Sequence, residues 1–600
     1  MQKYIFGLFI LFIIAYSCAN PGYPTGGPKD EDPPTIKKSV PLNGQMNYKK
    51  KEIMIEFDEI IKLNEVNQKL VVSPPLKERP NIEARAQKLY VDFNEDLQEN
   101  TTYTLDFADA IQDNNESNPI ESFVFSFSTG EVIDSFAIMG NVWNSFDLKP
   151  VEGALILAHK NLNDTAFTHD IPVRLGKSNE EGFFAIRNLS PGEYRLYAIE
   201  DANRNYKFDQ PGERIAWFDT IVSPHMEYVA FPDTLENDSV VFRDELVYTP
   251  NDVKLFMFEE QSKQQYFVGE ERKDSNIVSF IFNLPVEKFG VKPLNTEYDK
   301  DWAIFEPSLN NDTVKIWLTD SAMYKKDTLD LAFTYLGLDT LQNPIQVEDT
   351  LKLYYFEAPK KESKRKKKKD GPEPKKTLLI NNASSTVDVN STFNFILPTP
   401  VKKIDWNSIK LYEIVDTLMQ SIDYEFTQDS ALARRYSINT KTRWTPGGKY
   451  IIAADSAAIE DIYNLASDSI AKQFSVKTLD SYGTLLVNIT NPGENWLVQL
   501  MGNGEKVVTQ KYVPQTGKFA FQFIKPGSYS LKLIIDKNRN GKWDTGEYAI
   551  KKQPEQVFFY PQKVDVRANW DITVPWNPAE FDIYDYTLKD SKDKDKKSGR

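Results

Sequence analysis

The chain has 600 residues, of which 13% are aromatic and 26% are charged, and its formal net charge is −15. This length exceeds what one hydrophobic core organises, so we expect four to six modules, each of about 100 residues. The many aromatic residues argue against general disorder, and the acidic balance argues against nucleic-acid binding, which needs a basic face. One cysteine excludes an internal disulfide and a zinc site built from several thiolates, and three histidines leave few residues for a catalytic triad.

Residues 1–17 have the features of a signal peptide. Lys3 gives a positive start, and the apolar run 5–15 is too short to span a bilayer but fits the apolar region of a secretion signal. Small residues then lead through Ser17 into Cys18, which resembles a lipobox, whose cysteine becomes the acylated N-terminus. We therefore expect a lipoprotein held on the membrane through Cys18, because several acyl chains together anchor stably. The alternative is an ordinary secretory signal that happens to contain a cysteine.

Residues 18–34 are rich in Pro and Gly and carry no apolar periodicity, so they are expected to form a flexible spacer after the lipid anchor. The run GGPKD at 26–30, followed by Pro33 and Pro34, resembles the start of envelope lipoproteins from the Bacteroidetes. In that group an acidic cluster directly after the cysteine is associated with export to the cell surface. Here the first acid is Asp30. The resemblance therefore implies the outer membrane and leaves its periplasmic and cell-surface faces both open.

From about residue 50 to residue 570, apolar side chains recur at every second position. Two such stripes are formed by Ile53, Ile55 and Phe57 and by Phe123, Phe125 and Phe127. This period predicts β-strands, and their short length and close spacing favour antiparallel pairing. The fold class is therefore predicted to be all-β, a tandem series of antiparallel β-sandwich modules.

The first module, residues 35–131, resembles the bacterial Ig-like domain of surface-layer proteins. The segments that carry this resemblance are SVP at 39–41, FDE at 57–59, VSPP at 72–75, NTTYTL at 100–105 and FSFSTG at 125–130. Residues 377–479 repeat the same plan more faintly, and residues 248–357 show mainly its closing strand. Both segments are expected to be Ig-like sandwiches, separated by the basic linker 358–376.

A second and sharper repeat has an offset of 335 residues. Gly182, the turn at 191–194 and Asp201 recur, with every spacing kept, as Gly517, the turn at 526–529 and Asp536. Two copies of one module are therefore predicted, at 132–247 and 480–578. The Pro-Gly-x-Tyr turn followed by an alternating strand resembles carboxypeptidase-regulatory-like and adhesin B-type domains, which implies a prealbumin-like sandwich.

Each copy carries an Asp-rich loop directly after that strand. In the second copy, the oxygens expected to bind calcium come from Asp536, Asn538, Asn540, Lys542, Asp544 and Glu547. Calcium takes six to eight oxygen ligands, and this spacing fits the twelve-residue calcium-loop pattern. Lys542 would use its main-chain carbonyl, Glu547 both carboxylate oxygens, and Gly541 would permit the bend.

In the first copy, the corresponding ligands are Asp201, Asn203, Asn205, Lys207, Asp209 and Glu213. Tyr206 replaces the bend glycine and Pro211 adds a residue, and both changes are expected to weaken or reshape the site. Similar loops in adhesin B-type repeats bind calcium and stiffen the module. The alternative for both loops is a polar hairpin turn in which Asx side chains cap the main chain.

Three other features have structural interpretations. The basic run at 360–376 either contacts anionic envelope polymers or lipid headgroups or is a charged linker, and residues 579–600 are expected to be a disordered tail. Asp58 and Glu59 are the kind of carboxylate pair used by glycosidases, but they lie within the Ig-like strand pattern. His159 and His169 flank a predicted hairpin and are expected at the surface.

These features together predict a non-enzymatic cell-envelope lipoprotein that is a structural or protein-binding scaffold with calcium-stiffened modules. Its expected partners are the membrane, through the lipid anchor, and other envelope proteins, with no nucleic acid. Two alternatives remain open. One is a carbohydrate-binding surface lipoprotein, which glycan binding by exposed aromatic residues would reveal. The other is an accessory subunit of an envelope enzyme complex, or a hydrolase, which would need a pocket with convergent acids.

Overall fold

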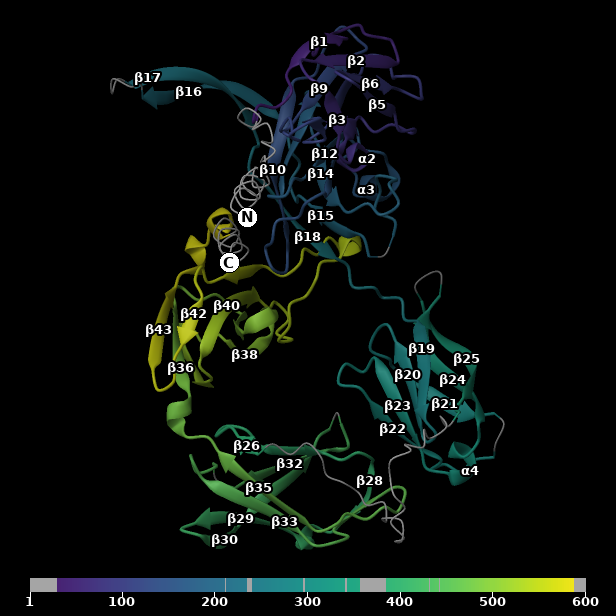
Figure 1. Cartoon of the computed structure of the whole chain (residues 1–600), viewed down its shortest axis with the longest axis vertical. Coiled ribbons are helices and arrows are strands. Elements are labelled where there is room, and N and C mark those ends of the chain that lie inside the picture. The colour runs from purple at the N-terminus through teal and green to yellow at the C-terminus, as the bar shows by residue number, and fades with distance from the viewer. Residues whose placement is uncertain are drawn as a thin grey trace, which may run out of the picture. The chain divides into compact units, whose positions relative to one another are not determined.

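The computed structural model of the chain describes residues 30–210, 212–234, 240–294, 297–339, 343–356, 385–430, 432–441 and 443–586. The predicted signal peptide, Cys18 and the predicted linker 358–376 lie outside these ranges. The chain divides into two compact units, residues 1–259 and residues 260–600, and strands dominate both (Figure 1). The all-β prediction is therefore confirmed. Among the described residues, no helix is both long enough and apolar enough to cross a membrane.

The first unit begins with a sandwich whose alternating strands bury one apolar face. Its elements are β1 (Ile36–Val40), β2 (Glu52–Phe57), β3 (Ile61–Leu63), α2 (Val66–Lys69), β4 (Val71–Ser73), β5 (Asn81–Arg85), β6 (Lys88–Asp92), β7 (Thr102–Asp106), β8 (Ile111–Asp113) and β9 (Val124–Ser128). The two main sheets have the orders β1-β2-β6-β5 and β4-β7-β9, and β3 pairs with β8. Ile53, Ile55 and Phe57 of β2 are fully buried, so the period of two in the sequence corresponds to the period of burial.

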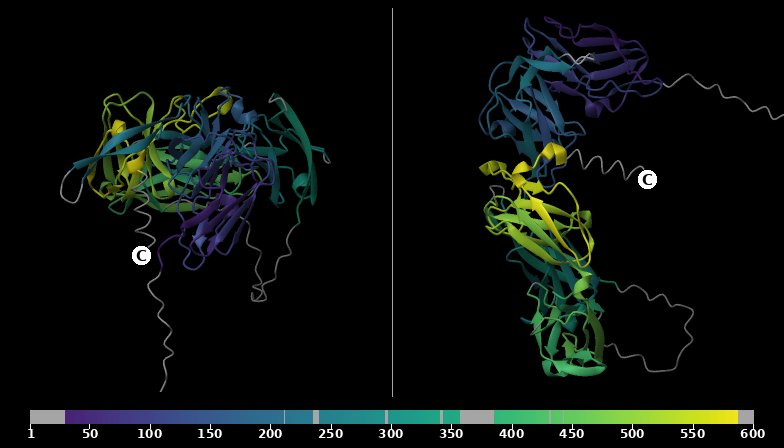
Figure 2. Two further views of the ribbon diagram at one scale, coloured as in Figure 1. Left: turned by 90° about the horizontal axis from the view of Figure 1, so that it is seen from above. Right: turned by 90° about the vertical axis from the view of Figure 1, so that its left-hand side faces the viewer.

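The second module of this unit is a sheet of seven strands in the order β12-β11-β14-β15-β18-β10-β13. The elements of the module are β10 (Phe136–Asn144), β11 (Leu155–His159), α3 (Ala166–His169), β12 (Arg174–Lys177), β13 (Phe183–Leu189), β14 (Arg195–Ile199), β15 (Arg214–Trp217), β16 (His225–Thr234), β17 (Val240–Thr249) and β18 (Val253–Glu259). The hairpin β16–β17 is a separate two-stranded sheet that projects from the module (Figures 1 and 2).

Strand β18 changes the boundary that the sequence predicts for this module. It pairs with β10 in parallel and with β15 in the antiparallel sense, so it belongs to the second module and not to the third. The predicted boundary after residue 247 falls before this strand. The hairpin β16–β17 separates β18 in sequence from the strands beside it, which hides the pairing from any local pattern.

The second unit begins with a sandwich of a four-stranded sheet, β19-β20-β23-β22, and a three-stranded sheet, β21-β24-β25. Its elements are β19 (Phe267–Asp274), β20 (Ile277–Phe282), β21 (Gly290–Pro293), β22 (Ala303–Pro307), β23 (Thr313–Leu318), α4 (Ser321–Tyr324), β24 (Thr328–Leu338) and β25 (Pro344–Tyr354). Phe280 and Phe333, one from each sheet, meet in a shared aromatic core with ring centroids 5.2 Å apart.

The next sandwich has a five-stranded sheet, β26-β35-β33-β29-β30, opposite β27-β32-β31, with β28 and β34 as a separate pair. Its elements are β26 (Thr386–Val387), β27 (Phe393–Ile396), β28 (Val401–Ile404), η1 (Trp406–Ser408), β29 (Ile409–Val415), β30 (Leu418–Ile422), β31 (Tyr424–Gln428), β32 (Arg435–Thr440), β33 (Lys449–Ala454), β34 (Ile459–Asp461), β35 (Ile470–Val476) and η2 (Leu479–Ser481). Trp444 and Tyr450 are buried at its centre.

The last sandwich has the sheets β39-β36-β43 and β38-β37-β40-β41, and β42 also pairs with β40. Its elements are β36 (Gly483–Ile489), β37 (Trp496–Met501), η3 (Asn503–Glu505), β38 (Val507–Tyr512), β39 (Lys518–Ile524), β40 (Gly527–Ile535), η4 (Tyr548–Ile550), β41 (Val557–Phe559), β42 (Val564–Val566), β43 (Asp571–Trp576) and η5 (Pro578–Glu580).

The last module repeats the pairing of the second one. Strand β36 pairs with β39 in the antiparallel sense and with β43 in parallel, as β10 does with β13 and β18. Gly182 and Gly517 precede the matching strands with φ of +72° and +70°. A Cβ there would lie 2.4 Å from the Val142 oxygen and 2.1 Å from the Ile489 oxygen. The repeated glycines therefore meet the same steric requirement.

Candidate functional site

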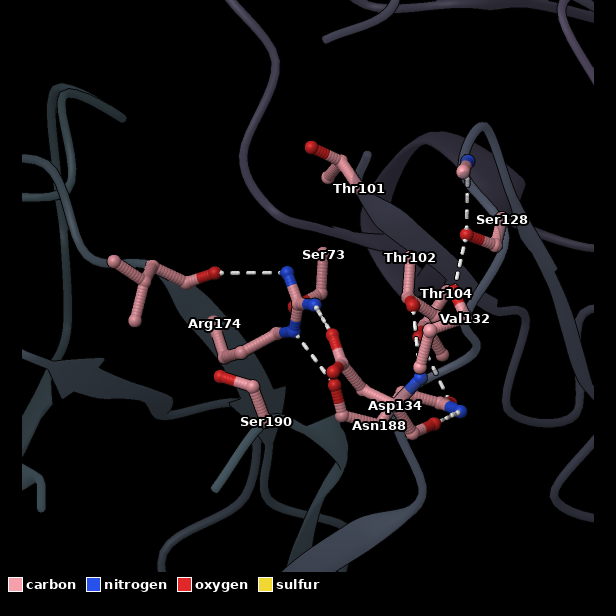
Figure 3. Close-up of polar contacts among 12 residues, drawn as sticks. Ser73, Thr101, Thr102, Thr104, Ser128, Val132, Asp134, Arg174, Asn188 and Ser190 are labelled. Carbon is pink, nitrogen blue, oxygen red and sulfur yellow. Dashed lines mark hydrogen bonds and ion pairs between the residues drawn. The ribbon is translucent and has the colours of Figure 1, made fainter. Parts of the chain in front are cut away.

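Arg174 of β12 is buried where the first two modules meet, with 8% of its surface exposed. Its Nε donates to the main-chain oxygen of Asn188 at 2.8 Å and its Nη1 to that of Val173 at 3.2 Å. Its Nη2 donates to Oδ2 of Asp134 at 2.9 Å (Figure 3). Burial lowers the pKa of Arg174, and Asp134 opposes that shift. Asp134 lies in the segment that connects the modules, so this ion pair fixes the connection to the second module.

Asn188 completes the junction from the end of β13, where it adopts a positive φ of 56°. Its Nδ2 donates to the main-chain oxygen of Asp134 at 2.8 Å. Its Oδ1 accepts a hydrogen bond from the Thr104 hydroxyl of β7 at 3.0 Å (Figure 3). It also accepts one from the Ser126 hydroxyl of β9 at 3.0 Å, so both strands of the first module contribute. Because the amide uses both of its ends, the turn of one module is held against the sheet of the other.

Two further contacts extend this junction. Ser73 Oγ of β4 accepts a hydrogen bond from the Leu175 main-chain nitrogen at 2.9 Å. Lys177 Nζ donates to the main-chain oxygen of Gln68 at 2.6 Å. The two modules are therefore joined by several independent polar contacts, which restrict rotation of one module on the other.

The second unit has similar polar junctions between its consecutive modules. Arg434 forms a two-pronged ion pair with Glu306, at 2.7 Å and 2.9 Å, and its guanidinium lies over the Trp317 ring at 5.0 Å. Asp388 accepts a hydrogen bond from the Tyr482 hydroxyl at 2.8 Å, and its other oxygen lies 3.0 Å from Lys525 Nζ. Paired charges and hydrogen bonds therefore recur wherever one sandwich follows another in this unit.

The loop after β40 is held by the side chain of Asp536, which is fully buried. Its carboxylate accepts hydrogen bonds from the main-chain nitrogens of Asn540 at 3.1 Å and Gly541 at 2.8 Å, and from the Tyr512 hydroxyl. Burial alone would raise the pKa of Asp536, but these hydrogen bonds outweigh it and hold the pKa below its usual value. Asp536 is therefore a carboxylate around which the loop folds.

Asp544 lies opposite, within reach of both asparagines of this loop. Asn538 Nδ2 donates to it at 2.5 Å and Asn540 Nδ2 at 3.0 Å. The main-chain nitrogen of Lys542 donates to Oδ1 of Asn540 at 2.8 Å. Four of the predicted ligand residues therefore converge, and Lys542 joins them through its main chain.

The loop after β14 has the same contacts at the equivalent positions. Asp201 accepts from the main-chain nitrogens of Asn205 at 3.2 Å and Tyr206 at 2.7 Å. Asp209 accepts from the amides of Asn203 at 3.0 Å and Asn205 at 2.5 Å. The main-chain nitrogen of Lys207 donates to Asn205 Oδ1 at 2.8 Å.

Tyr206 stands where the second loop has Gly541, and the bend is nevertheless retained. Tyr206 has a φ of +63° and Gly541 a φ of +76°. Tyr206 was expected to weaken or reshape this loop, but its backbone makes the same left-handed bend as Gly541. The main-chain hydrogen bonds to Asp201 hold Tyr206 in a conformation that side chains rarely adopt.

The closing carboxylate of the second loop is Glu555, which the sequence pattern does not indicate. Glu213 Oε1 accepts from the Ala202 nitrogen at 3.2 Å, and Glu555 Oε1 accepts from the equivalent Lys537 nitrogen at 2.8 Å. The other oxygen of each glutamate accepts from the main-chain nitrogen of the second aspartate, Asp209 or Asp544, at 3.4 Å and 3.1 Å. Glu213 and Glu555 are thus equivalent residues.

Glu547, the predicted closing ligand, lies elsewhere. Its side chain accepts from Lys263 Nζ at 2.5 Å, and its main chain pairs with Lys552. The sequence separation explains the error, because the hydrogen-bonded pair is 11 residues apart in the first loop and 18 in the second. The twelve-residue pattern selects a glutamate that comes before an added segment of the second loop.

Glu555 is buried, and burial raises its pKa, with the charges of Asp544 and Asp536 adding to the effect and the two main-chain donors opposing it. Across the described residues, no group of three or more His, Cys, Asp or Glu side chains is arranged to hold a metal ion. A cation in either loop would therefore depend on amide and main-chain oxygens as well as carboxylates.

His159 is the histidine whose position differs from the sequence expectation. It is 1% exposed, and its ring packs edge-on against Tyr197 with centroids 5.5 Å apart. Its Nε2 has no hydrogen-bond partner within the described part of the chain. Burial lowers the pKa of His159 to about 4, and Asp170 acts weakly in the other direction. The expected surface position holds for His169, which is exposed, and is wrong for His159.

Residues 30–129 match the family of bacterial Ig-like domains. This match confirms the resemblance of the first module, and it covers that module alone. No curated protein matches the chain.

Solved structures give only loose similarities. The major pilin subunit BcpA of Bacillus cereus is 10% identical, with 74% of this chain and 99% of BcpA covered and a TM-score of 0.13. The S-layer protein fragment rSbsC(31-844) is 8% identical, with coverage of 89% and 67% and a TM-score of 0.13. The BSP domain of a biofilm associated protein is 9% identical, with coverage of 92% and 100% and a TM-score of 0.13. At scores this low the similarity carries no argument about arrangement or function.

Proposed function

We propose that this protein is a non-enzymatic structural scaffold of the cell envelope. The Arg174 junction is the observation that carries the proposal. There an arginine, an aspartate and an asparagine that would be costly to bury alone are used to join two modules. The Glu306–Arg434 pair and the Asp388 cluster serve the same purpose in the second unit. A chain that fixes successive sandwiches together supports the role of a spacer or a platform for other envelope proteins.

The anchor is part of this proposal. The sequence around Cys18 supports acylation, and the spacer that follows supports a sandwich series held away from an outer membrane. Fractionation of cells that express the full chain tests the anchor. The wild-type protein is expected in the membrane fraction and released by detergent, whereas Cys18→Ser is expected in the soluble fraction. Equal membrane retention of both would contradict lipid anchoring.

The scaffold is tested separately by its partners. Envelope proteins that co-purify with the wild-type chain from crosslinked membranes support a platform. Recovery of the chain with no other protein, or activity of the purified chain on an envelope polymer, contradicts it. Protease treatment of intact cells then distinguishes the cell-surface face from the periplasmic face.

Calcium in the two loops is the finer part of the proposal. The side chains of four loop residues lie close together: Asp536, Asn538, Asn540 and Asp544. The Glu555 carboxylate accepts a hydrogen bond from the main-chain nitrogen of Asp544 beside them. A calcium ion between them would replace the amide hydrogens as the partner of Asp544, once the asparagine oxygens turn inward. The first loop offers the equivalent set, closed by Glu213. Amide and main-chain oxygens would complete the coordination beside the carboxylates, and a mixed site of this kind suits the submillimolar to millimolar affinity of extracellular modules.

Thermal unfolding of the full chain tests this part. Calcium is expected to raise the melting temperature of the modules that carry the loops, and chelation is expected to reverse the shift. An unchanged melting temperature at millimolar calcium would remove calcium from the proposal and leave the scaffold unaffected.

A further inference from the structure

The hairpin of β16 and β17 is a two-stranded sheet that extends away from the second module (Figures 1 and 2). Its ten cross-strand pairs begin at His225–Thr249, beside the module, and end at Thr234–Val240. An isolated two-stranded ribbon is marginally stable in water, and stability usually requires further strands or a packed face. A hairpin of this length therefore gains stability when another molecule covers one of its faces.

One face of this hairpin is mainly apolar. Residues that pair directly across two antiparallel strands point to the same side, so the register assigns each side chain to a face. The described residues of the first face, which we call the apolar face, are Met226, Tyr228, Ala230, Pro232, Phe242, Asp244, Leu246 and Tyr248. Tyr228 is 75% exposed and Phe242 is 67% exposed, so most of each ring is in contact with solvent.

The opposite face of the hairpin has a different composition. Its described residues are mixed in character: His225, Glu227, Val229, Phe231, Arg243, Glu245, Val247 and Thr249. Charged and apolar side chains together are ordinary on a sheet surface that faces water. On the apolar face, Asp244 is the one charged residue among those that the structure describes. The contrast indicates that the apolar face is the one that binds.

The position of Asp244 restricts what can cover this face. Asp244 is exposed and pairs with Ala230 near the middle of the hairpin, so a covering molecule must bury its carboxylate. Burying an ionised carboxylate is costly unless a cation pairs with it. A second copy, related by a twofold axis through the middle of the face, would bring a like charge to the same place. Lipid chains offer no counter-charge.

We propose that the apolar face docks another envelope protein, whose contacting surface is apolar with one lysine or arginine opposite Asp244. This inference rests on the proposed scaffold function and names the surface at which a partner binds. Tyr228 and Phe242 are aromatic side chains of the kind that anchor protein interfaces once they are buried. Their burial would supply affinity, and the ion pair of Asp244 would fix the orientation and exclude other apolar surfaces.

Site-specific photocrosslinking of the full chain in cells tests the proposal. Photoreactive p-benzoylphenylalanine in place of Tyr228 is expected to give a crosslinked product with one other protein. The same photoreactive residue in place of Glu227, the neighbouring position on the opposite face, is expected to give at least tenfold less of this product. A product of two copies of the chain, a product with lipid, equal yields from both positions or no product would overturn the proposal.

Charge reversal tests the predicted ion pair, with the crosslinked protein identified by mass spectrometry and then purified. Asp244→Lys in the full chain is expected to weaken its binding at least tenfold, because two cations would then face each other. Glu245→Lys is the matched control, since it makes the same charge change at an exposed neighbour on the opposite face, and it is expected to keep the affinity within twofold. Thermal unfolding checks that both variants keep the fold.

A compensating change in the partner completes this test. Replacing the partner's facing lysine or arginine by aspartate is expected to restore binding to Asp244→Lys. Equal effects of Asp244→Lys and Glu245→Lys, or no restoration by any such change, would refute the docking surface. Envelope proteins that co-purify equally with the wild type and with Asp244→Lys would also refute it and leave the scaffold standing, whereas recovery of the chain alone would overturn both.

Discussion

Replacing Arg174 by methionine tests the rigid junction of the first two modules. The substitution keeps the length of the side chain and removes hydrogen bonds to Asp134, Asn188 and Val173. The side chains of Arg174 and Asp134 are only 9% and 21% exposed, so the change leaves a carboxylate without its counter-charge in a poorly solvated place. Breaking a buried pair in this way costs about 3 kcal/mol or more. That energy corresponds to about a 150-fold larger equilibrium constant for local opening.

Hydrogen exchange of the full chain, followed by mass spectrometry, measures this opening. Exchange is expected to accelerate in peptides from β7, β9 and β10 and to stay unchanged in the second unit. Arg195→Met is the matched control, because Arg195 pairs with Asp164, whose side chain is 54% exposed. An exposed pair contributes about 1 kcal/mol at most. Equal effects of the two substitutions would show that the junction is not fixed by Arg174.

Three further outcomes follow from particular side chains. The pKa of His159, about 4, lies below the unfolded value of 6.5, so the stability of the wild type is full above pH 6.5 and decreases as the pH falls. The wild type is therefore expected to lose about 2 kcal/mol between pH 7.5 and pH 5. His159→Phe is expected to abolish this loss, which urea unfolding at both pH values checks. Gly517→Ala is expected to destabilise the protein by about 2–4 kcal/mol in thermal unfolding, because the added Cβ would meet the Ile489 oxygen. Gly504 also has a positive φ but lies in open space, so Gly504→Ala should cost about 1 kcal/mol in the same measurement. Arg434→Met is expected to lower the free energy of unfolding by about 3 kcal/mol, because it leaves Glu306 buried and unpaired. Tryptophan fluorescence during denaturation measures this change, and an effect below about 1 kcal/mol would contradict a buried pair.

The sequence predicts those features whose cause is local. Alternating Ile53, Ile55 and Phe57 predict a half-buried strand because the side-chain period of a strand is two. The repeated Gly182 and Gly517 mark two equivalent turns because only glycine fits beside the facing carbonyl oxygen. These signals establish the fold class and the internal repeat without any knowledge of the tertiary structure.

Features that depend on distant segments could not be predicted in this way. Strand β18 joins the second module through its pairing with β10 and β15, which are both distant in sequence. Glu555 closes the second loop after an added segment, so a fixed spacing selects Glu547 instead. Arg174 has no distinctive sequence context, and its role arises because the connecting segment places Asp134 opposite it. Comparison of the two copies, position by position, was the one signal able to question Glu547.

The central claim about the two Asp-rich loops is that they are equivalent and are closed by Glu213 and Glu555, and calcium binding tests this claim most directly. Calorimetric titration of the full chain is expected to show two calcium ions bound. Glu555→Gln should reduce the number to one, and Glu547→Gln should leave it at two. Absence of calcium binding, or loss of a site in Glu547→Gln and not in Glu555→Gln, would contradict this account of the loops and leave the scaffold unaffected.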